Sequence, residues 1–456
     1  MKASFYTLGC KLNYAETASL QRQFKERGFD IVPFSESSDV CIINTCSVTE
    51  RADREARQIV RRAMRTSPEA FVAVVGCYAQ LDPETIASID GVDMVLGASE
   101  KFRVFDFAGS FQKFSAPKVF VGSIETANDF GPAYSGGVDD RTRAFLKVQD
   151  GCDFNCAFCT IPLARGESRS QSIEACVTQA RHLVEMGYKE IILTGVNVGD
   201  FGKKEDRSFI QLLTALDGVD GIERIRVSSI EPNLLTEELI DTWLGSKKVC
   251  DHFHIPLQSG TDEILRKMRR RYTTDYYHRL IHSIRSKSPQ AGIGVDVIVG
   301  FPGETEAIFQ ESFNFIHELP VSYLHVFTYS ERPNTPSVNY PGRIEPRVRY
   351  SHSDSLRVVG QMKRSAFHQS QRGKILPVLI EGTIENNTLS GYTNNYVRVT
   401  VPYHPSLENV IAMARIGEFT GEHCEGEVVS VASAPSVIIP KPSIPIISSA
   451  VFKGVL

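Results

Sequence analysis

Short apolar runs alternate with longer amphipathic segments in the first hundred residues. Three runs are rich in β-branched and aromatic residues, as buried strands are: 4–8, 40–44 and 72–76. Three segments repeat their apolar positions with a helical period: 13–28, 52–66 and 83–90. Alternating strands and helices predict an α/β domain, a parallel sheet with helices on both faces, over residues 1–108.

The middle of the chain repeats this alternation six times. The candidate strands are the apolar runs 144–149, 190–195, 224–229, 252–257, 292–300 and 322–329. Six β/α units predict a partial, open (β/α)6 barrel, and we assign residues 143–371 to it. Active groups in barrels of this kind lie at the carboxyl ends of the strands.

The pattern changes again after residue 371. Residues 372–433 contain short strands separated by Gly and Asn turns, which predicts a small all-β barrel of the OB-like kind. Residues 109–142 are rich in Gly, Ser and Phe and are expected to be a linker. The tail at 434–456 has no clear pattern.

Length and composition agree with a globular protein of several domains. The chain has 456 residues, 42% of them hydrophobic and 23% charged, so two or three domains are expected. No apolar stretch approaches the roughly 20 residues that cross a bilayer. The net charge of −4 argues against a protein coated in nucleic acid but leaves room for a local basic face. Without a signal-peptide pattern, we expect a cytoplasmic protein.

Three cysteines, Cys152, Cys156 and Cys159, form a CxxxCxxC motif directly after the first barrel strand. Three thiolates can hold three irons of a [4Fe-4S] cluster and leave the fourth iron open for a substrate. A zinc site would need a fourth ligand near by, and the next cysteines, Cys176 and Cys250, lie in apolar segments. Disulfides would need an oxidising compartment. The spacing is the signature of radical S-adenosylmethionine (SAM) enzymes.

A cysteine also follows each of the three amino-terminal strands: Cys10, Cys46 and Cys77. The carboxyl ends of parallel strands meet at one edge of the sheet, where ligands bind. This placement suits a second [4Fe-4S] cluster with an open iron. The alternative is three buried structural cysteines, an interpretation that suits Cys41 inside its strand.

Polar or glycine-bearing turns follow several barrel strands, where they can contact SAM. Glycines let the backbone approach a ligand, and hydroxyls and amides offer hydrogen bonds. Ordinary β/α turns use the same residues, but their recurrence favours a SAM pocket. The candidate cofactor-binding residues are Thr194, Asn197, Ser229, Glu231, Gln258, Pro302 and Gly303.

Basic residues at helical spacing suggest where RNA binds. Four arginines stack along one helix face: Arg54, Arg57, Arg61 and Arg65. A second basic cluster lies at 266–271, and in the terminal barrel Tyr392, Tyr396 and Arg398 are candidates. That barrel, with four Lys and Arg against seven Glu, is a poor general phosphate binder. The alternative for the helix is a solvated face paired with Glu50 and Glu55.

The order of these parts resembles that of the radical SAM methylthiotransferase family. The motifs that carry the resemblance are TLGC, NTCSVTERA, VVGCYAQ, GCDFNCAFCTIP, SSIEP, HIPLQSG and GFPGET. The resemblance covers residues 1–433 and is greatest to the branch acting on threonylcarbamoyladenosine beside the tRNA anticodon. Other branches act on isopentenyl-adenosine in tRNA or on a ribosomal-protein aspartate. The terminal barrel would then be a TRAM domain.

The resemblance implies two [4Fe-4S] clusters, SAM and six catalytic cysteines. The cluster on Cys152, Cys156 and Cys159 would cleave SAM to a carbon radical that removes hydrogen from carbon 2 of adenine. The cluster on Cys10, Cys46 and Cys77 would present sulfur, and a second SAM would methylate it. Implied partners are the tRNA anticodon stem-loop and an electron donor such as flavodoxin or ferredoxin. The rival classes are a radical SAM modifier without sulfur insertion and a non-enzymatic iron–sulfur or RNA-binding scaffold.

Overall fold

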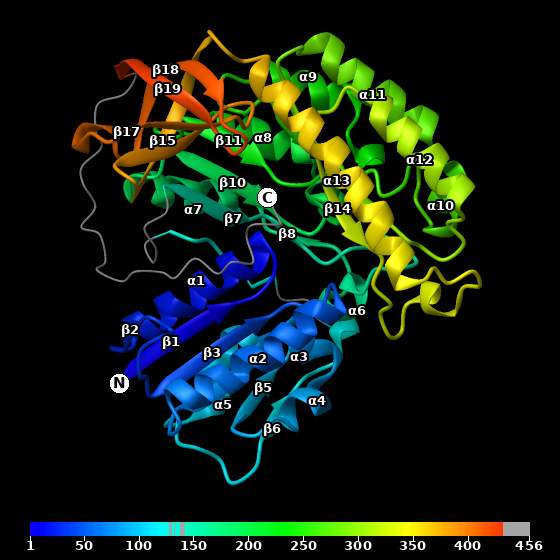
Figure 1. Ribbon diagram of the computed structural model, residues 1–456. Helices are drawn as coiled ribbons and strands as arrows, with labels where there is room; N and C mark the ends of the chain where they lie inside the picture. Colours follow the sequence, from blue (N-terminus) through cyan, green and yellow to red (C-terminus); the bar gives the residue numbers. More distant parts are fainter. Residues whose placement is uncertain (127–129, 132, 137–141, 432–456) are drawn as a thin grey trace.

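A computed structural model describes residues 1–126, 130–131, 133–136 and 142–431. The tail expected at 434–456 lies outside these residues, as do parts of the expected linker. The chain folds into an amino-terminal α/β lobe, a partial barrel and a small closed β-barrel (Figure 1). No helix in the described part combines the length and the apolar character that a membrane-spanning helix needs.

The amino-terminal lobe is a wholly parallel sheet, as the alternating pattern predicted. Its strands, in the order β2-β1-β3-β4-β5-β6, are β1 (Lys2–Thr7), β2 (Asp30–Val32), β3 (Val40–Thr45), β4 (Phe71–Gly76), β5 (Met94–Leu96) and β6 (Lys118–Phe120). Its helices are α1 (Lys11–Glu26), α2 (Glu50–Thr66), α3 (Cys77–Leu81), α4 (Pro83–Ala87) and α5 (Val104–Ala108). Apolar side chains of α1 and α5 pack on one face of the sheet, and those of α2, α3 and α4 pack on the other.

The middle of the chain forms the predicted open barrel. Its strands are β7 (Arg143–Lys147), β10 (Glu190–Thr194), β11 (Arg224–Val227), β12 (His252–His254), β13 (Gly292–Val299) and β14 (Tyr323–Thr328). They pair in parallel as two three-stranded sheets, β11-β10-β7 and β12-β13-β14, which single bridges join between β11 and β12. Among the described residues no ladder joins β7 to β14, so the barrel stays open.

Helices between these strands cover the outside of the barrel (Figure 1). They are α7 (Ile173–Glu185), α8 (Phe209–Asp217), α9 (Glu237–Gly245), α10 (Asp262–Lys267), α11 (Thr274–Lys287) and α12 (Glu306–Glu318). The short α6 (Ile161–Arg165) and the two-stranded pair of β8 (Gln149–Asp150) and β9 (Arg169–Ser170) follow β7. The side chains between strands and helices form the largest apolar core of the chain.

The carboxyl-terminal strands close into the small barrel that the sequence predicted. They are β15 (Ile375–Glu385), β16 (Thr388–Thr393), β17 (Arg398–Pro402), β18 (Val410–Phe419) and β19 (Cys424–Val431), in the order β15-β16-β17-β19-β18. A long helix that the sequence patterns did not single out, α13 (Pro346–Gln369), leads into it and packs beside β14. Strand β6 falls within the range expected to be a linker and forms an edge of the amino-terminal sheet.

Candidate functional site

The three amino-terminal cysteines follow neighbouring strands at one edge of the sheet. Cys10 is the N-cap of α1 after β1, Cys46 follows β3, and Cys77 begins α3 directly after β4. Gly9 has a φ of +96°, and a Cβ atom there would lie 2.6 Å from the Cβ of Cys46. Only glycine permits this backbone conformation and this approach, so it brings Cys10 and Cys46 together.

The amino-terminal thiols influence one another's protonation. Burial raises the pKa of Cys46 to about 12, and the neighbouring Cys77 and Cys10 raise it as well. Burial also raises the pKa of Cys77, although the cations of Arg165 and Lys101 oppose this. Since metals bind the thiolate, thiols with raised pKa values would release protons on binding any metal.

Backbone and side-chain N–H groups point at the sulfurs of the CxxxCxxC loop. The Phe154 N–H donates to Cys152 Sγ over 3.4 Å, and the Ile161 N–H donates to Cys159 Sγ over 3.5 Å. Burial raises the pKa of the Cys152 and Cys159 thiols to about 12. Donors of this kind stabilise thiolates bound to metal and tune the potential of a cluster.

Arg270 completes this arrangement from a distant part of the chain. Its Nη1 lies 3.1 Å from Cys156 Sγ, and its Nη2 forms an ion pair with Glu231. The sequence presented Arg270 only as part of the basic cluster at 266–271. The structure instead places its side chain, 3% exposed, against a cysteine of the radical SAM motif.

Neither cysteine triplet has the spacing for a single metal ion. Thiolates around one tetrahedral zinc lie about 3.8 Å apart, given Zn–S bonds of about 2.3 Å. Among the described residues, only His254, Asp296 and His325 bring three potential ligand atoms within 4.8 Å of one another. The three sulfurs of each triplet are therefore spaced more widely than the ligands of one tetrahedral zinc.

The two cysteine triplets lie on adjoining segments of the two lobes. Thr160, the residue after Cys159, donates from Oγ1 to the carbonyl oxygen of Ser47, the residue after Cys46, over 3.3 Å. Arg332 donates to Ser47 Oγ over 2.7 Å and pairs with Asp53 over 2.6 Å. These contacts hold the segment that follows Cys46 against the segment that follows Cys159.

A buried ion network holds the two lobes in this relation. Glu16 of α1 pairs with Arg165 of α6 at 3.0 Å, with Lys101 at 2.6 Å and with Lys147 at 3.2 Å. Burial alone would raise the pKa of Glu16, but these three cations lower it well below its usual value. The network therefore consists of charged groups, and it links the helix that Cys10 begins to the strand before the CxxxCxxC loop.

A cavity of about 180 Å³ lies where all three parts of the chain meet. The amino-terminal lobe contributes Cys10, Lys11 and Leu12, and the small barrel contributes Tyr396. The remaining lining comes from the β/α barrel: Thr194, Gly195, Val196, Arg226, Val227, Ser228, Ser229, His252, His254, Asp296, Tyr323, His325 and Phe327. Burial at this position lowers the pKa of Lys11.

The predicted SAM-binding residues differ in how close they lie to the cavity. Thr194 and Ser229 line the cavity, and both polar atoms of the buried Asn197 amide lack hydrogen-bond partners in the described structure. Glu231 is engaged by Arg270, and Gln258 sits at a φ of +70° beside β13. Pro302 and Gly303 are not among the cavity's lining residues. A Cβ atom at Gly303 would contact Lys267, so this turn packs against α10.

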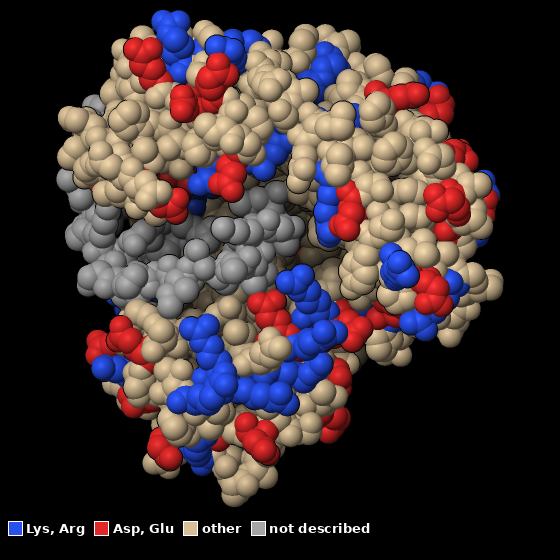
Figure 2. Space-filling view, viewed as in Figure 1, with Lys and Arg blue, Asp and Glu red and all other residues tan. Residues whose placement is uncertain are grey.

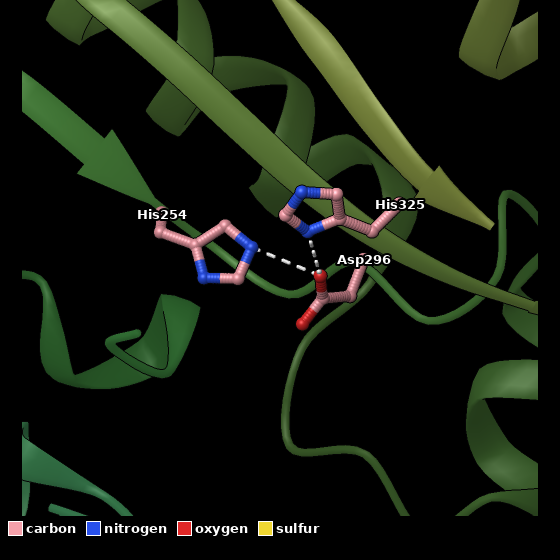
Figure 3. Close-up of side chains that lie close together, drawn as sticks. All are labelled: His254, Asp296 and His325. Carbon is pink, nitrogen blue, oxygen red and sulfur yellow. Dashed lines mark hydrogen bonds and ion pairs between the residues drawn. The ribbon is translucent and has the colours of Figure 1, made fainter. Parts of the chain in front are cut away.

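Two histidines converge on one carboxylate in the cavity wall (Figure 3). His254 Nε2 and His325 Nδ1 lie 2.9 and 3.1 Å from Asp296 Oδ1. Ser229 Oγ lies 2.6 Å from the other ring nitrogen of His254. Sequence reasoning missed these residues, although polar side chains inside otherwise apolar strands were a signal that could have found them.

The predicted arginine stripe lies on the surface of the amino-terminal lobe. Lys and Arg side chains gather over α2 in Figure 2. Arg54, Arg61 and Arg65 are exposed, whereas Arg57 donates to the Tyr78 hydroxyl over 2.8 Å. Arg57 and Arg61 line a surface pocket of about 300 Å³. Of the arginine–glutamate pairs expected for a solvated face, the described structure has the one between Arg54 and Glu50, at 3.4 Å. Most arginines of the stripe are therefore not paired with these glutamates.

The aromatic candidates of the small barrel dock it onto the β/α barrel. The Tyr396 ring stacks on His252, with centroids 4.4 Å apart, and Arg143 lies over the Tyr392 ring. Arg398 lies on β17, and its Nε is buried without a hydrogen-bond partner in the described structure. Tyr392 and Tyr396 therefore serve this interface and are not free to stack on RNA.

Two family models match the chain. Residues 146–316 match the radical SAM superfamily, and residues 2–97 match a family described as "Uncharacterized protein family UPF0004". These ranges contain the CxxxCxxC motif and the three amino-terminal cysteines, respectively.

Among solved structures, the fold is similar to the radical S-adenosylmethionine methyltransferase TsrM from Kitasatospora setae. The form with tryptophan and a SAM analogue gives a TM-score of 0.54 at 14% identity, covering 84% of this chain and 79% of that chain. At this identity the likeness concerns the fold alone.

Curated relatives match over nearly the whole chain. "Threonylcarbamoyladenosine tRNA methylthiotransferase MtaB" from Bacillus subtilis is 38% identical, covering 94% of this chain and 96% of the relative. The protein of the same name from Aquifex aeolicus is 38% identical, covering 88% and 96%. "tRNA-2-methylthio-N(6)-dimethylallyladenosine synthase" from Syntrophotalea carbinolica is 32% identical, covering 91% and 97%. The cysteine motifs, the fold and this full-length similarity together show that the chain belongs to the radical SAM methylthiotransferase family.

Proposed function

We propose that this enzyme attaches a methylthio group to carbon 2 of N6-threonylcarbamoyladenosine beside the tRNA anticodon. The observation that carries the proposal is the meeting of two cysteine triplets, through Ser47 and Thr160, next to a cavity that Cys10 lines. Two relatives named for threonylcarbamoyladenosine, from Bacillus subtilis and Aquifex aeolicus, are 38% identical, and three others of that name are 32–33% identical. The dimethylallyladenosine synthase from Syntrophotalea carbinolica is 32% identical.

The six cysteines would hold two [4Fe-4S] clusters, three thiolates to each. When bound, these groups and SAM supply the electron, the carbon radical, the sulfur and the methyl group of the reaction. The chain's own part is to deprotonate and orient the thiols, through N–H donors to Cys152, Cys156 and Cys159. Three predicted SAM contacts support this arrangement best. Thr194 and Ser229 line the cavity, and the buried amide of Asn197 has no hydrogen-bond partner in the described structure.

The arginine stripe of α2 would bind the backbone of the anticodon stem-loop. Arginines spaced along one helix face can follow successive phosphates, and the target base must leave its stack to reach the cavity. A reduced flavodoxin or ferredoxin is the proposed electron donor.

Mass spectrometry of tRNA nucleosides from a deletion strain tests the proposed function. We expect the methylthio form of threonylcarbamoyladenosine to disappear and its unmethylthiolated precursor to accumulate. The wild-type gene should restore the product, and Cys46→Ala should not. Cys41→Ser is the matched control, because Cys41 is buried in the same sheet beside Ser4 and Ser38.

Two outcomes would contradict the proposal. Loss of methylthiolated isopentenyl-adenosine alone would assign the enzyme to the other tRNA branch. Full product with Cys46→Ala would instead indicate a radical SAM modifier that inserts no sulfur.

A further inference from the structure

Lys11 is a cation in the cavity wall whose ammonium group is not ion-paired within the described part of the chain. It is the first residue of α1, directly after Cys10, and its side chain lines the cavity where the three parts of the chain meet. Within the described residues its ammonium group makes no hydrogen bond and no ion pair, and Tyr396 and Asp296 act on it only through electrostatic interaction across the cavity. An ammonium group held away from bulk water is costly unless it is paired.

The other charges that face the cavity are already paired. Arg226 binds Glu190, with its Nε 2.8 Å from Glu190 Oε1. Asp296 accepts hydrogen bonds from His254 and His325. Lys11 is therefore, among the described lining residues, the charged side chain that has neither an ion pair nor a hydrogen bond, although the Asp296 carboxylate faces the same cavity.

A second polar atom in the wall also lacks a partner. The Asp296 carboxylate can only accept, so His254 donates to it from Nε2. In the neutral ring His254 Nδ1 then accepts from the Ser229 hydroxyl. His325 donates from Nδ1 to the same carboxylate oxygen, and its Nε2 is buried without a hydrogen bond in the described structure (Figure 3). In the neutral ring this nitrogen is an acceptor, ready for an N–H or O–H of a ligand.

We propose that Lys11 binds the carboxylate of the substrate's N6 substituent, while His325 Nε2 accepts a proton donor of the same substituent. This inference rests on the proposed function. The threonylcarbamoyl group carries a carboxylate, a hydroxyl and N–H groups, whereas an isopentenyl group offers none of these. Lys11 and His325 would thus be specificity-determining residues for an anionic substituent.

The position and the size of the cavity fit this role. Carbon 2 of adenine, which receives sulfur, is separated by a single ring nitrogen from carbon 6, which bears the substituent. A base that presents carbon 2 to a cluster held by Cys10 therefore brings its N6 substituent within reach of Lys11. The volume of about 180 Å³ lies below the roughly 300–1,000 Å³ typical of sites for drug-sized ligands, and a small group such as the N6 substituent suits a space of this size.

Binding measurements on the reconstituted holoprotein, under anaerobic conditions, test the inference. The probes are anticodon stem-loop oligonucleotides that carry threonylcarbamoyl-adenosine, its methyl ester, isopentenyl-adenosine or adenosine at the modified position. Fluorescence anisotropy at fixed salt gives a Kd for each with wild type, Lys11→Gln and Lys25→Gln. Lys25 is exposed on the same helix and is the matched control.

We expect wild type and Lys25→Gln to prefer the free carboxylate over adenosine. Lys11→Gln should lose about 10- to 100-fold of that preference, the range for a charge-assisted hydrogen bond. Its affinity for the adenosine probe should stay the same. The methyl ester should bind wild type as weakly as the free acid binds Lys11→Gln. This arm needs no variant and holds even if Lys11→Gln fails to load its clusters.

The outcomes separate this inference from the function on which it rests. The role of Lys11 is overturned, and the proposed function stands, if Lys11→Gln prefers the free acid over adenosine as strongly as wild type does. The methyl ester would then also bind wild type as tightly as the free acid does. If wild type shows no preference and forms no methylthio product from the threonylcarbamoyl probe, both are overturned.

Discussion

At the scale of single residues, Arg270 shows how a side chain far along the chain reaches a thiol of the CxxxCxxC motif. Its guanidinium contacts Cys156 Sγ and is anchored by Glu231, which follows another barrel strand. A donor to a thiolate sulfur withdraws negative charge and makes a bound cluster easier to reduce. Glu231, predicted as a cofactor contact, therefore also positions this arginine.

Arg270→Gln should make the cluster on the CxxxCxxC motif harder to reduce. We expect a more negative midpoint potential in an electron paramagnetic resonance redox titration. Reductive SAM cleavage should be about 10- to 100-fold slower, the usual effect of losing a group that supports a metal ligand. Arg271→Gln is the control, because Arg271 is exposed and packs on Phe154 without contacting a cysteine sulfur. An unchanged potential in Arg270→Gln would contradict this role.

At the scale of elements, α2 joins the site to the surface. Its N-cap is Thr49, three residues after Cys46, whose side chain accepts from the Ala52 N–H. The helix therefore starts close to Cys46. The buried side of α2 packs on the sheet through Ala56, Val60 and Ala63. Its outer side carries the arginines, and this division explains why the stripe is exposed.

The double variant Arg61→Gln/Arg65→Gln should weaken tRNA binding through lost phosphate contacts. We expect the slope of log Kd against log salt to fall by about 1.4 to 1.8, at roughly 0.7–0.9 for each of the two contacts. Arg27→Gln/Arg103→Gln, in the same lobe on the other face of the sheet, should leave the slope unchanged. Equal slopes for the two double variants would show that the stripe is only a solvated face.

At the scale of the whole molecule, the small barrel completes the cavity instead of standing apart. Arg226 donates to the carbonyl oxygens of Thr393 and Asn394, and Arg224 donates to those of Tyr392 and Pro377. Both arginines lie on β11 and pair with the buried carboxylate of Glu190, Arg226 over 2.8 Å and Arg224 over 3.8 Å. The docking of the third part of the chain therefore depends on one carboxylate inside the second.

Stability should depend on pH through Glu190. Burial alone would raise its pKa, but Arg226, Arg143 and Arg224 lower the pKa from 4.5 to about 2. The folded state then holds the carboxylate more tightly ionised than the unfolded state. This contributes about 3 kcal/mol above pH 4.5, which is lost as the pH falls toward 2.

Urea unfolding at pH 7 and pH 3 measures this contribution. Glu190→Gln should be less stable than wild type at pH 7 and should lose less stability on acidification. Glu223→Gln, at a more exposed pair with Lys189, should behave like wild type. If Glu190→Gln and wild type lose equal stability between the two pH values, Glu190 is not the group responsible.

Much of the fold was predictable because periodic apolar runs dominate it. The strand expected at 292–300 is β13 (Gly292–Val299), and the one expected at 190–195 is β10 (Glu190–Thr194). The short edge strand β6 has too few residues to show a period. Helix α13 escaped notice because most of its residues are polar and only a narrow side is buried.

The sequence by itself determined which residues carry the chemistry. Thiol spacing and strand-end position are local properties, and local patterns show them. Only the tertiary structure decided which of these groups meet: Lys11, His325 and Tyr396 in one cavity, and Arg270 on Cys156. These contacts join residues that are far apart in the sequence. Packing and buried charge bring them together, and neither leaves a regular spacing along the chain.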